Sequence, residues 1–236
     1  MALDEALLLH HLAGKTEPVV RLYGWSSPAV SIGYGQDWNT DVNQEACARN
    51  GAAVVRRITG GGAVFHDAEV TYSLAAPASD LGKTIEDSFR EVSRALVAGL
   101  KRLGLESEFV PLNDLLVNGK KISGSAQVRR DGTILQHGTI LLKADTEKMF
   151  ELLPVPEQKL KRKRIARPAD RVTSIEDELG REVAYEEAVS ALRDGFEEWL
   201  GAPLTRFTPD KTFKNLARRL EKNKYSTRDW NEKRIF

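Results

Sequence analysis

A run of three glycines at positions 60–62 is the first place in this sequence where residue types and spacing could do chemistry. Because glycine lacks a Cβ atom, such a loop can adopt positive φ angles and bring successive backbone N–H groups close to an anion. Arg56 and Arg57 precede the loop and could pair with a phosphate or a carboxylate. The spacing matches neither the dinucleotide-binding fingerprint nor a P-loop. From these residues alone, a binding loop and an ordinary turn with surface arginines are equal alternatives.

A lysine followed by small residues is the second candidate site. Lys121 lies two residues before Ser123, and Gly124, Ser125 and Ala126 follow. An ammonium beside closely approaching backbone can neutralise a phosphate or polarise the carbonyl in an acyl-transfer transition state. Taken by itself, however, this segment is better interpreted as a hairpin turn with an ordinary lysine.

Two histidines, one cysteine and a basic segment are weaker candidates. His66 and His137 lie in strand-like segments, where a single histidine is more often structural than catalytic. Cys47 lies among small residues of a helix-like segment without a nearby histidine, and we expect it to be buried filler. The Lys/Arg-rich residues 159–164 predict a solvated surface, with docking of an acidic partner protein as the alternative.

The composition is that of a folded globular protein. The chain has 236 residues with 35 basic and 34 acidic side chains, so its formal net charge is +1. This balance gives no general attraction to nucleic acid or to an anionic membrane, and no apolar run approaches the roughly 20 residues of a membrane span. One cysteine excludes an internal disulfide and a multi-cysteine zinc site. The acidic N-terminal segment does not resemble a signal peptide, and we expect a cytoplasmic protein without nucleic-acid or membrane partners.

Hydrophobic periodicity predicts a strand-rich first part and a helix-rich remainder. Strands are expected at residues 19–23, 29–33, 53–58, 64–65, 70–75, 115–117, 122–129 and 133–142. Helices are expected at residues 3–12, 43–49, 85–103, 146–153 and 185–200, with a polar helical tail from residue 212. Thr84 and Asp87 resemble a capping arrangement for the longest helix. This order predicts an α+β fold, a mixed β-sheet layered with helices, in one domain over residues 1–236 that is strand-rich to residue 145 and helix-rich from residue 146.

Taken in order along the chain, these motifs resemble the lipoate–protein ligase family, whose relatives include octanoyltransferases and biotin ligases. Residues 1–7 look like the family's first helix, and residues 56–67 are similar to its arginine and triple-glycine signature. Asn113-Asp114 and residues 121–126 look like its lysine motif, and His137-Gly138-Thr139 follows at the family position. Residues 224–231 resemble the end of its catalytic domain. One such motif would be weak evidence, whereas five in the same order are strong.

The resemblance implies a biotin/lipoate-ligase-like catalytic domain and a reaction in two steps. A carboxylate, lipoate or octanoate, would attack the α-phosphate of ATP in the presence of Mg²⁺ and form an acyl-adenylate. A lysine of a lipoyl domain or an H-protein-like carrier would then take the acyl group as an amide. These residues include no C-terminal accessory domain of the kind that single-chain ligases carry, which suggests a separate accessory ligase subunit as a partner.

The resemblance also implies roles for individual residues. Lys121 would be catalytic and bridge the phosphate and the acyl carbonyl. Asp114 would bind the metal ion and, together with Asn113, the nucleotide. The other contacts to ATP or lipoyl-adenylate would come from Arg57, Gly60, Gly61, Gly62, Ala63, Val64 and Phe65. The acyl pocket would be formed by His66, Ser125, Ala126, His137 and Gly138.

Three other functions are alternatives to an ATP-dependent ligase. An ATP-independent octanoyl or lipoyl transferase between carrier proteins is the main alternative, but this sequence has no cysteine where octanoyltransferases carry their nucleophile. A biotin ligase would carry an Arg-Gly-Arg-Gly loop, which is absent. A non-catalytic module that binds acylated carriers would not need Arg57, the glycine loop and Lys121 together. The sequence therefore predicts an ATP-dependent lipoate–protein ligase.

Overall fold

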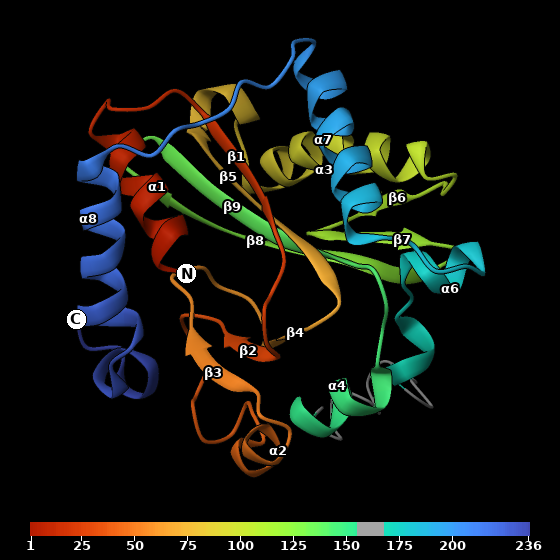
Figure 1. The fold of residues 1–236 in the computed structure, drawn as a ribbon, viewed down its shortest axis with the longest axis horizontal. Helices are drawn as coiled ribbons and strands as arrows, with labels where there is room; N and C mark the ends of the chain where they lie inside the picture. The colour runs from red at the N-terminus through yellow and green to blue at the C-terminus, as the bar shows by residue number, and fades with distance from the viewer. Residues whose placement is uncertain (155–167) are drawn as a thin grey trace.

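The computed structural model describes residues 1–154 and 168–236, and its largest element is a six-stranded antiparallel sheet (Figure 1). The strand order is β1-β5-β9-β8-β7-β6. The strands are β1 (Val19–Tyr23), β5 (Glu69–Pro77), β6 (Glu108–Val110), β7 (Asp114–Val117), β8 (Lys120–Arg130) and β9 (Thr133–Leu141). Asp131 and Gly132 have positive φ angles of 45° and 79°, as a tight hairpin turn between β8 and β9 requires.

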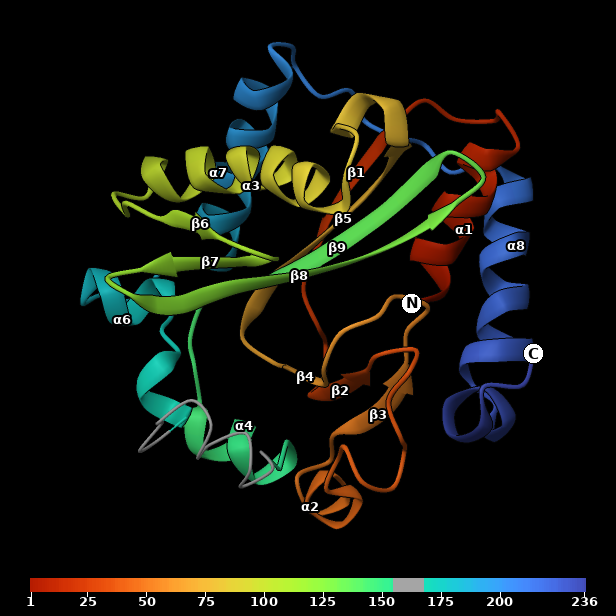
Figure 2. The same cartoon turned by 180° about the vertical axis from the view of Figure 1, so that it is seen from behind.

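A second, three-stranded sheet lies beside the large one (Figures 1 and 2). It consists of β2 (Ala29–Ile32), β3 (Ala53–Arg56) and β4 (Val64–His66), with β3 parallel and β4 antiparallel to β2. The helices α2 (Gln44–Arg49) and α4 (Thr146–Leu152) share an apolar cluster with this sheet. Since the glycine loop connects β3 to β4, the small sheet sets the position of that loop.

Side-chain alternation gives the large sheet two different faces. In β5, Val70, Tyr72 and Leu74 are buried in the main core together with α3 and α7, whereas Thr71 and Ser73 point to the other face. One end of that other face is covered by α1, and α8 packs against α1 (Figures 1 and 2). The helices are α1 (Ala2–Leu12), α3 (Ile85–Arg102), α7 (Tyr185–Leu200) and α8 (Lys211–Leu220). Polar side chains on the remainder of this face are therefore free to form a site.

The expected α+β class, with helices layered on sheets, is confirmed. The small sheet combines a parallel and an antiparallel pair of strands, whereas all strand pairs in the large sheet are antiparallel. The capping box of Thr84 and Asp87 begins α3 as expected. The strand expected at residues 53–58 ends at Arg56 instead. The chain turns there because the next arginine, Arg57, bonds to the carbonyls of the glycine loop.

The elements that the sequence did not predict are short. The π-helical turns η3 (Glu221–Tyr225) and η4 (Asp229–Lys233) lie in the helical tail expected from residue 212, and the unpredicted elements are β6, η1 (Ala78–Leu81), η2 (Pro168–Arg171) and α6 (Ile175–Leu179). Each spans too few residues for hydrophobic periodicity to reveal it. The basic segment at residues 159–164 lies outside the described residues. Within the described residues, no helix combines the length and the apolar character that crossing a membrane requires.

Candidate active site

A cavity of about 540 Å³ lies between the large and the small sheet, and this volume is in the range of roughly 300–1,000 Å³ found for small-molecule sites. Its walls come from the glycine loop, β8, β9 and α4. Most of the residues expected in the site line it: Arg57, Gly61, Gly62, Ala63, Val64, Phe65, His66, Asn113, Lys121, Ser125, Ala126, His137 and Gly138. Gly60 and Asp114 do not line it but contact Arg57 and Lys121, respectively. The structure thus brings the separate sequence motifs together around one space.

The Arg57 side chain holds the glycine loop through backbone carbonyls. Its Nη2 donates to the carbonyl oxygens of Gly60 and Gly62 at 2.7 and 2.8 Å, and its Nη1 donates to that of Ser31 at 3.0 Å. Burial lowers the pKa of the Arg57 guanidinium to about 10. Its hydrogen-bond partners among the described residues are all neutral groups. A negative charge that binds or develops in the cavity would therefore be stabilised by this cation.

Arg56, the other arginine before the loop, does not line the cavity. Its fully buried side chain donates to the carbonyl oxygens of Gly33, Tyr34 and Gln36, at 3.1, 3.0 and 2.7 Å. Its Nε also donates to the carbonyl oxygen of Asn231, at 2.9 Å. Arg56 therefore joins the C-terminal residues to the small sheet and does not supply charge to the cavity.

Gly33 supports the glycine loop through close backbone contact. A Cβ atom at Gly33 would lie 2.0 Å from the carbonyl oxygen of Gly61, so the loop would have to move. We expect Gly33→Ala to lower the free energy of unfolding by about 1–3 kcal/mol, measured by denaturant titration. Gly35→Ala is the matched control, because a Cβ atom there meets nothing within 4 Å. Equal stability of the two variants would show that Gly33 does not support the loop.

Lys121, the second residue of β8, has its ammonium in an ion pair. Its Nζ lies 2.6 Å from Oδ1 of Asp114 on the neighbouring strand β7, and the two side chains are 43% and 34% exposed. Gly124 gives the ammonium room, since a Cβ atom at Gly124 would lie 2.7 Å from Nζ. Asp114 therefore orients Lys121, which lies between solvent and the cavity wall.

The carboxylate of Asp114 does not fit an Mg²⁺ site as it stands. It faces a lysine ammonium, and in residues 1–154 and 168–236 no group of three His, Cys, Asp or Glu side chains could hold a metal ion. Mg²⁺ is normally bound through one or two carboxylates together with waters and substrate phosphates. The metal role of Asp114 stays a prediction.

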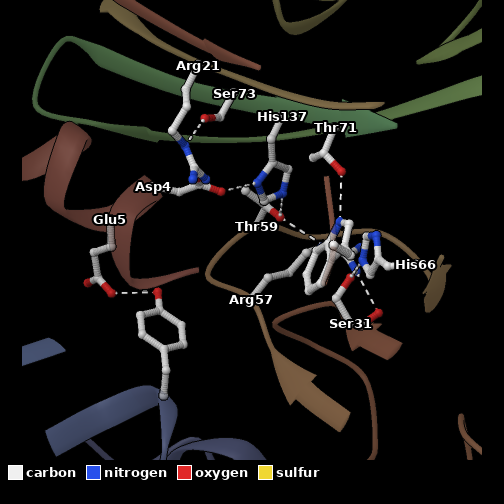
Figure 3. Close-up of polar contacts among 12 residues, drawn as sticks. Asp4, Glu5, Arg21, Ser31, Arg57, Thr59, His66, Thr71, Ser73 and His137 are labelled. Carbon is white, nitrogen blue, oxygen red and sulfur yellow. Dashed lines mark hydrogen bonds and ion pairs between the residues drawn. The ribbon is translucent and has the colours of Figure 1, made fainter. Parts of the chain in front are cut away.

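His137 connects a hydroxyl to a buried carboxylate (Figure 3). Its Nε2 lies 2.7 Å from Oγ1 of Thr59, and its Nδ1 lies 3.1 Å from Oδ2 of Asp4. Burial lowers the pKa of His137. Burial would by itself raise the pKa of Asp4, but the N-terminal ammonium and Arg21 outweigh it and the pKa falls. A neutral imidazole thus donates from Nδ1 to an ionised Asp4 and accepts the hydroxyl proton of Thr59 at Nε2.

His66 makes the same kind of connection at another wall of the cavity. Its Nε2 lies 2.7 Å from Oγ of Ser31, and its Nδ1 lies 2.7 Å from Oε1 of Glu69. All three residues are buried, and both Ser31 and His66 line the cavity. Sequence reasoning missed Ser31 and Glu69. The available signal was the hydroxyl of Ser31 between Val30 and Ile32 in an otherwise apolar strand.

Cys47 lies away from the cavity, as its surroundings in the sequence predict. It is 1% exposed, within the apolar cluster shared by α2 and the small sheet. Burial raises the pKa of its thiol, which keeps the thiol protonated. A protonated and enclosed thiol is a poor nucleophile, so Cys47 belongs to the core.

The model of the lipoyl protein ligase A/B catalytic domain matches residues 1–197. The chain belongs to this family. Two lipoate ligase structures share its fold. The bi-partite lipoate protein ligase of Thermoplasma acidophilum, studied with its E2 lipoyl domain, is 31% identical with a TM-score of 0.86, covering 100% of this chain and 91% of that one. A lipoate-protein ligase A bound with ATP is 31% identical with a TM-score of 0.85, covering 99% and 93%.

Curated members of the family correct the expected activity. The octanoyltransferases LipM of Anoxybacillus flavithermus and Geobacillus kaustophilus are 37% and 38% identical to this chain, and each match covers 99% of the chain and 93% of the relative. The prediction of an ATP-dependent lipoate–protein ligase is therefore wrong. The glycine loop and the lysine motif line the same cavity, and both ligases and octanoyltransferases resemble this chain, so these motifs could not decide between the two activities. The chain is an enzyme of the lipoate and octanoate ligase and transferase family.

Proposed function

We propose that the chain is an ATP-independent acyltransferase, which moves an octanoyl or lipoyl group from one carrier protein to a lysine of another. The observation that carries this proposal is the cavity, whose lining combines the cations Arg57 and Lys121 with apolar side chains. Full-length similarity to LipM octanoyltransferases supports the choice of reaction. These apolar side chains include Ile122, Leu141 and Met149, which suit an alkyl chain, since each buried CH₂ group contributes about 0.8 kcal/mol.

A carrier thioester is already an activated acyl donor, so this reaction needs no adenylate. Attack on the acyl carbon breaks the carbon–sulfur bond and releases a thiol, and the acceptor lysine ends as an amide. Negative charge develops on the carbonyl oxygen during attack. Lys121 and Arg57, which both line the cavity, would stabilise that charge, and such stabilisation is usually a large contribution to acyl transfer.

We propose a lipoyl domain as the acceptor. The T. acidophilum ligase, which shares this fold, was studied together with an E2 lipoyl domain. Lys121 is 43% exposed, so an acceptor lysine can reach this side of the cavity from solvent. The separate accessory subunit stays a prediction, supported by the description of that ligase as bi-partite, and adding a candidate second chain to the assay tests it.

An assay with purified components tests the function. The enzyme is incubated with an octanoyl-carrier thioester and an unmodified lipoyl domain, without nucleotide and with EDTA, and the mass of the acceptor is followed. We expect octanoylation of the acceptor, with no increase when ATP and Mg²⁺ are added. A parallel reaction with free octanoate, ATP and Mg²⁺ is expected to give no product. Product formed only in the ATP reaction would contradict the proposal.

A further inference from the structure

Glu69 anchors a line of hydrogen bonds whose direction is fixed by chemistry. The indole Nε1 of Trp25 donates to Oγ1 of Thr71 at 2.9 Å, and Thr71 in turn donates to Oε1 of Glu69 at 2.7 Å. Indole nitrogen can only donate a hydrogen bond, so the Thr71 proton is directed to the carboxylate. The indole ring of Trp25 also stacks on His66, with ring centroids 4.1 Å apart. These contacts hold both the carboxylate and the imidazole in place.

The carboxylate of Glu69 also determines where the protons of His66 and Ser31 lie. Because Glu69 accepts, His66 donates to it from Nδ1 at 2.7 Å. In a neutral imidazole the other nitrogen is then unprotonated, so Nε2 accepts the hydroxyl proton of Ser31 at 2.7 Å. From the other side, Nη1 of Arg57 donates to Oγ of Ser31 at 3.2 Å (Figure 3). Ser31 therefore gives its proton to a base and receives a hydrogen bond from a cation.

A hydroxyl, an imidazole and a carboxylate in this order form the arrangement that activates a serine nucleophile. The guanidinium of Arg57 adds to the activation, because a nearby positive charge favours the ionised hydroxyl. Ser31 and His66 line the cavity, where the acyl carbon of a substrate would lie. The nucleophile, the base and the group that orients the base are thus all present beside the substrate site.

The other two candidate nucleophiles are less suitable. Thr59 makes an equivalent set with His137 and Asp4 and is as buried as Ser31, but Thr59 does not line the cavity. Cys47 is enclosed in the apolar cluster of the small sheet. The choice among these three hydroxyl and thiol groups therefore falls on Ser31.

We propose that Ser31 carries the acyl group as an ester intermediate during transfer, an inference that rests on the proposed acyltransferase function. In the first step Oγ of Ser31 attacks the thioester carbon, its proton passes to Nε2 of His66, and the carbon–sulfur bond breaks. The proton then passes from His66 to the leaving sulfur, which departs as a thiol. In the second step a neutral lysine amine of the acceptor attacks the ester. His66 takes a proton from that amine, the bond between the acyl carbon and Oγ of Ser31 breaks, and the proton passes to Oγ, leaving an amide on the acceptor.

The test is to trap this ester. The enzyme is mixed with octanoyl-carrier thioester in the absence of acceptor, quenched in acid and examined by intact mass and peptide mapping. We expect one octanoyl group on the peptide that contains Ser31, and its disappearance when acceptor is added before the quench. Ser31→Ala should show no adduct and lose at least about 100-fold in transfer rate, because removing the nucleophile from such a set is more costly than this in subtilisin.

Two further variants separate loss of the nucleophile from loss of structure. Ser31→Cys should retain an adduct, now a thioester that neutral hydroxylamine cleaves readily. Cys47→Ser should retain both the adduct and the transfer rate. Transfer by the unaltered enzyme with no adduct on Ser31, or transfer by Ser31→Ala at the original rate, would overturn the ester while leaving the proposed function intact. Failure of the unaltered enzyme to use the thioester at all would overturn both.

Discussion

Replacing Lys121 with Ala is expected to lower kcat/KM for acyl transfer by at least about 100-fold, or about 3 kcal/mol of transition-state stabilisation. The ammonium lines the cavity and is held 2.6 Å from the Asp114 carboxylate, so it is in place before the substrate binds. Charge develops on the acyl oxygen only during attack, and a cation fixed in advance therefore favours the transition state over the bound substrate. Initial rates at several donor concentrations measure the effect.

Lys120→Ala is the matched control for this variant. Lys120 is the preceding residue of the same strand, is exposed and does not line the cavity. We expect the control to transfer at nearly the original rate, and both variants to keep their melting temperature, because the Lys121 pair is partly exposed and such pairs contribute little to stability. An unchanged kcat/KM in Lys121→Ala would remove this residue from the mechanism.

Replacing Glu5 with Ala is expected to lower the free energy of unfolding by about 3–5 kcal/mol, the range found when one partner of a buried ion pair is removed. The Glu5 carboxylate accepts from Nζ of Lys224 at 2.9 Å and from the hydroxyl of Tyr225 at 2.7 Å. Lys224 is 4% exposed, so loss of Glu5 leaves an ammonium buried without its carboxylate. These contacts join α1 to the residues that follow α8.

Denaturant unfolding of three variants measures this contribution. Glu5→Gln keeps a hydrogen-bond acceptor for Tyr225 but removes the charge, and its stability is expected to lie between those of Glu5→Ala and the unaltered protein. Glu232→Ala, which removes the partner of the exposed Arg228, is expected to cost less than about 1 kcal/mol. If Glu5→Ala were no less stable than Glu232→Ala, α1 would not depend on this buried pair.

Local pattern was sufficient for much of the fold. The helix α7 has the bounds that its apolar spacing predicts, and α3 begins after the capping residue Thr84. The glycine loop was a candidate because of its residue types, whereas the role of Lys121 followed from the resemblance to the family, because its segment alone is better interpreted as a hairpin turn. The arrangement of two sheets was not predictable in this way, since it depends on pairings such as β2 with β4, which lie far apart in the sequence.

The hydrogen-bonded sets around the histidines show why the rest of the site was missed. Taken alone, His66 and His137 are each better interpreted as structural residues. Their partners Ser31 and Asp4 lie 35 and 133 positions away in the sequence. No local sequence motif can therefore indicate these hydrogen bonds. The missing cysteine disfavoured an acyltransferase at the level of sequence, but a hydroxyl activated through tertiary contacts could take the place of a thiol.

The source of the transferred acyl group is the most direct test of this account. The enzyme is given an octanoyl-carrier thioester with one isotope label and free octanoate with another, together with ATP, Mg²⁺ and an acceptor lipoyl domain. The label on the acceptor lysine is then read by mass spectrometry. We predict that it comes from the thioester. Label taken from the free acid would show that the enzyme activates octanoate with ATP, and would contradict the proposed acyltransferase.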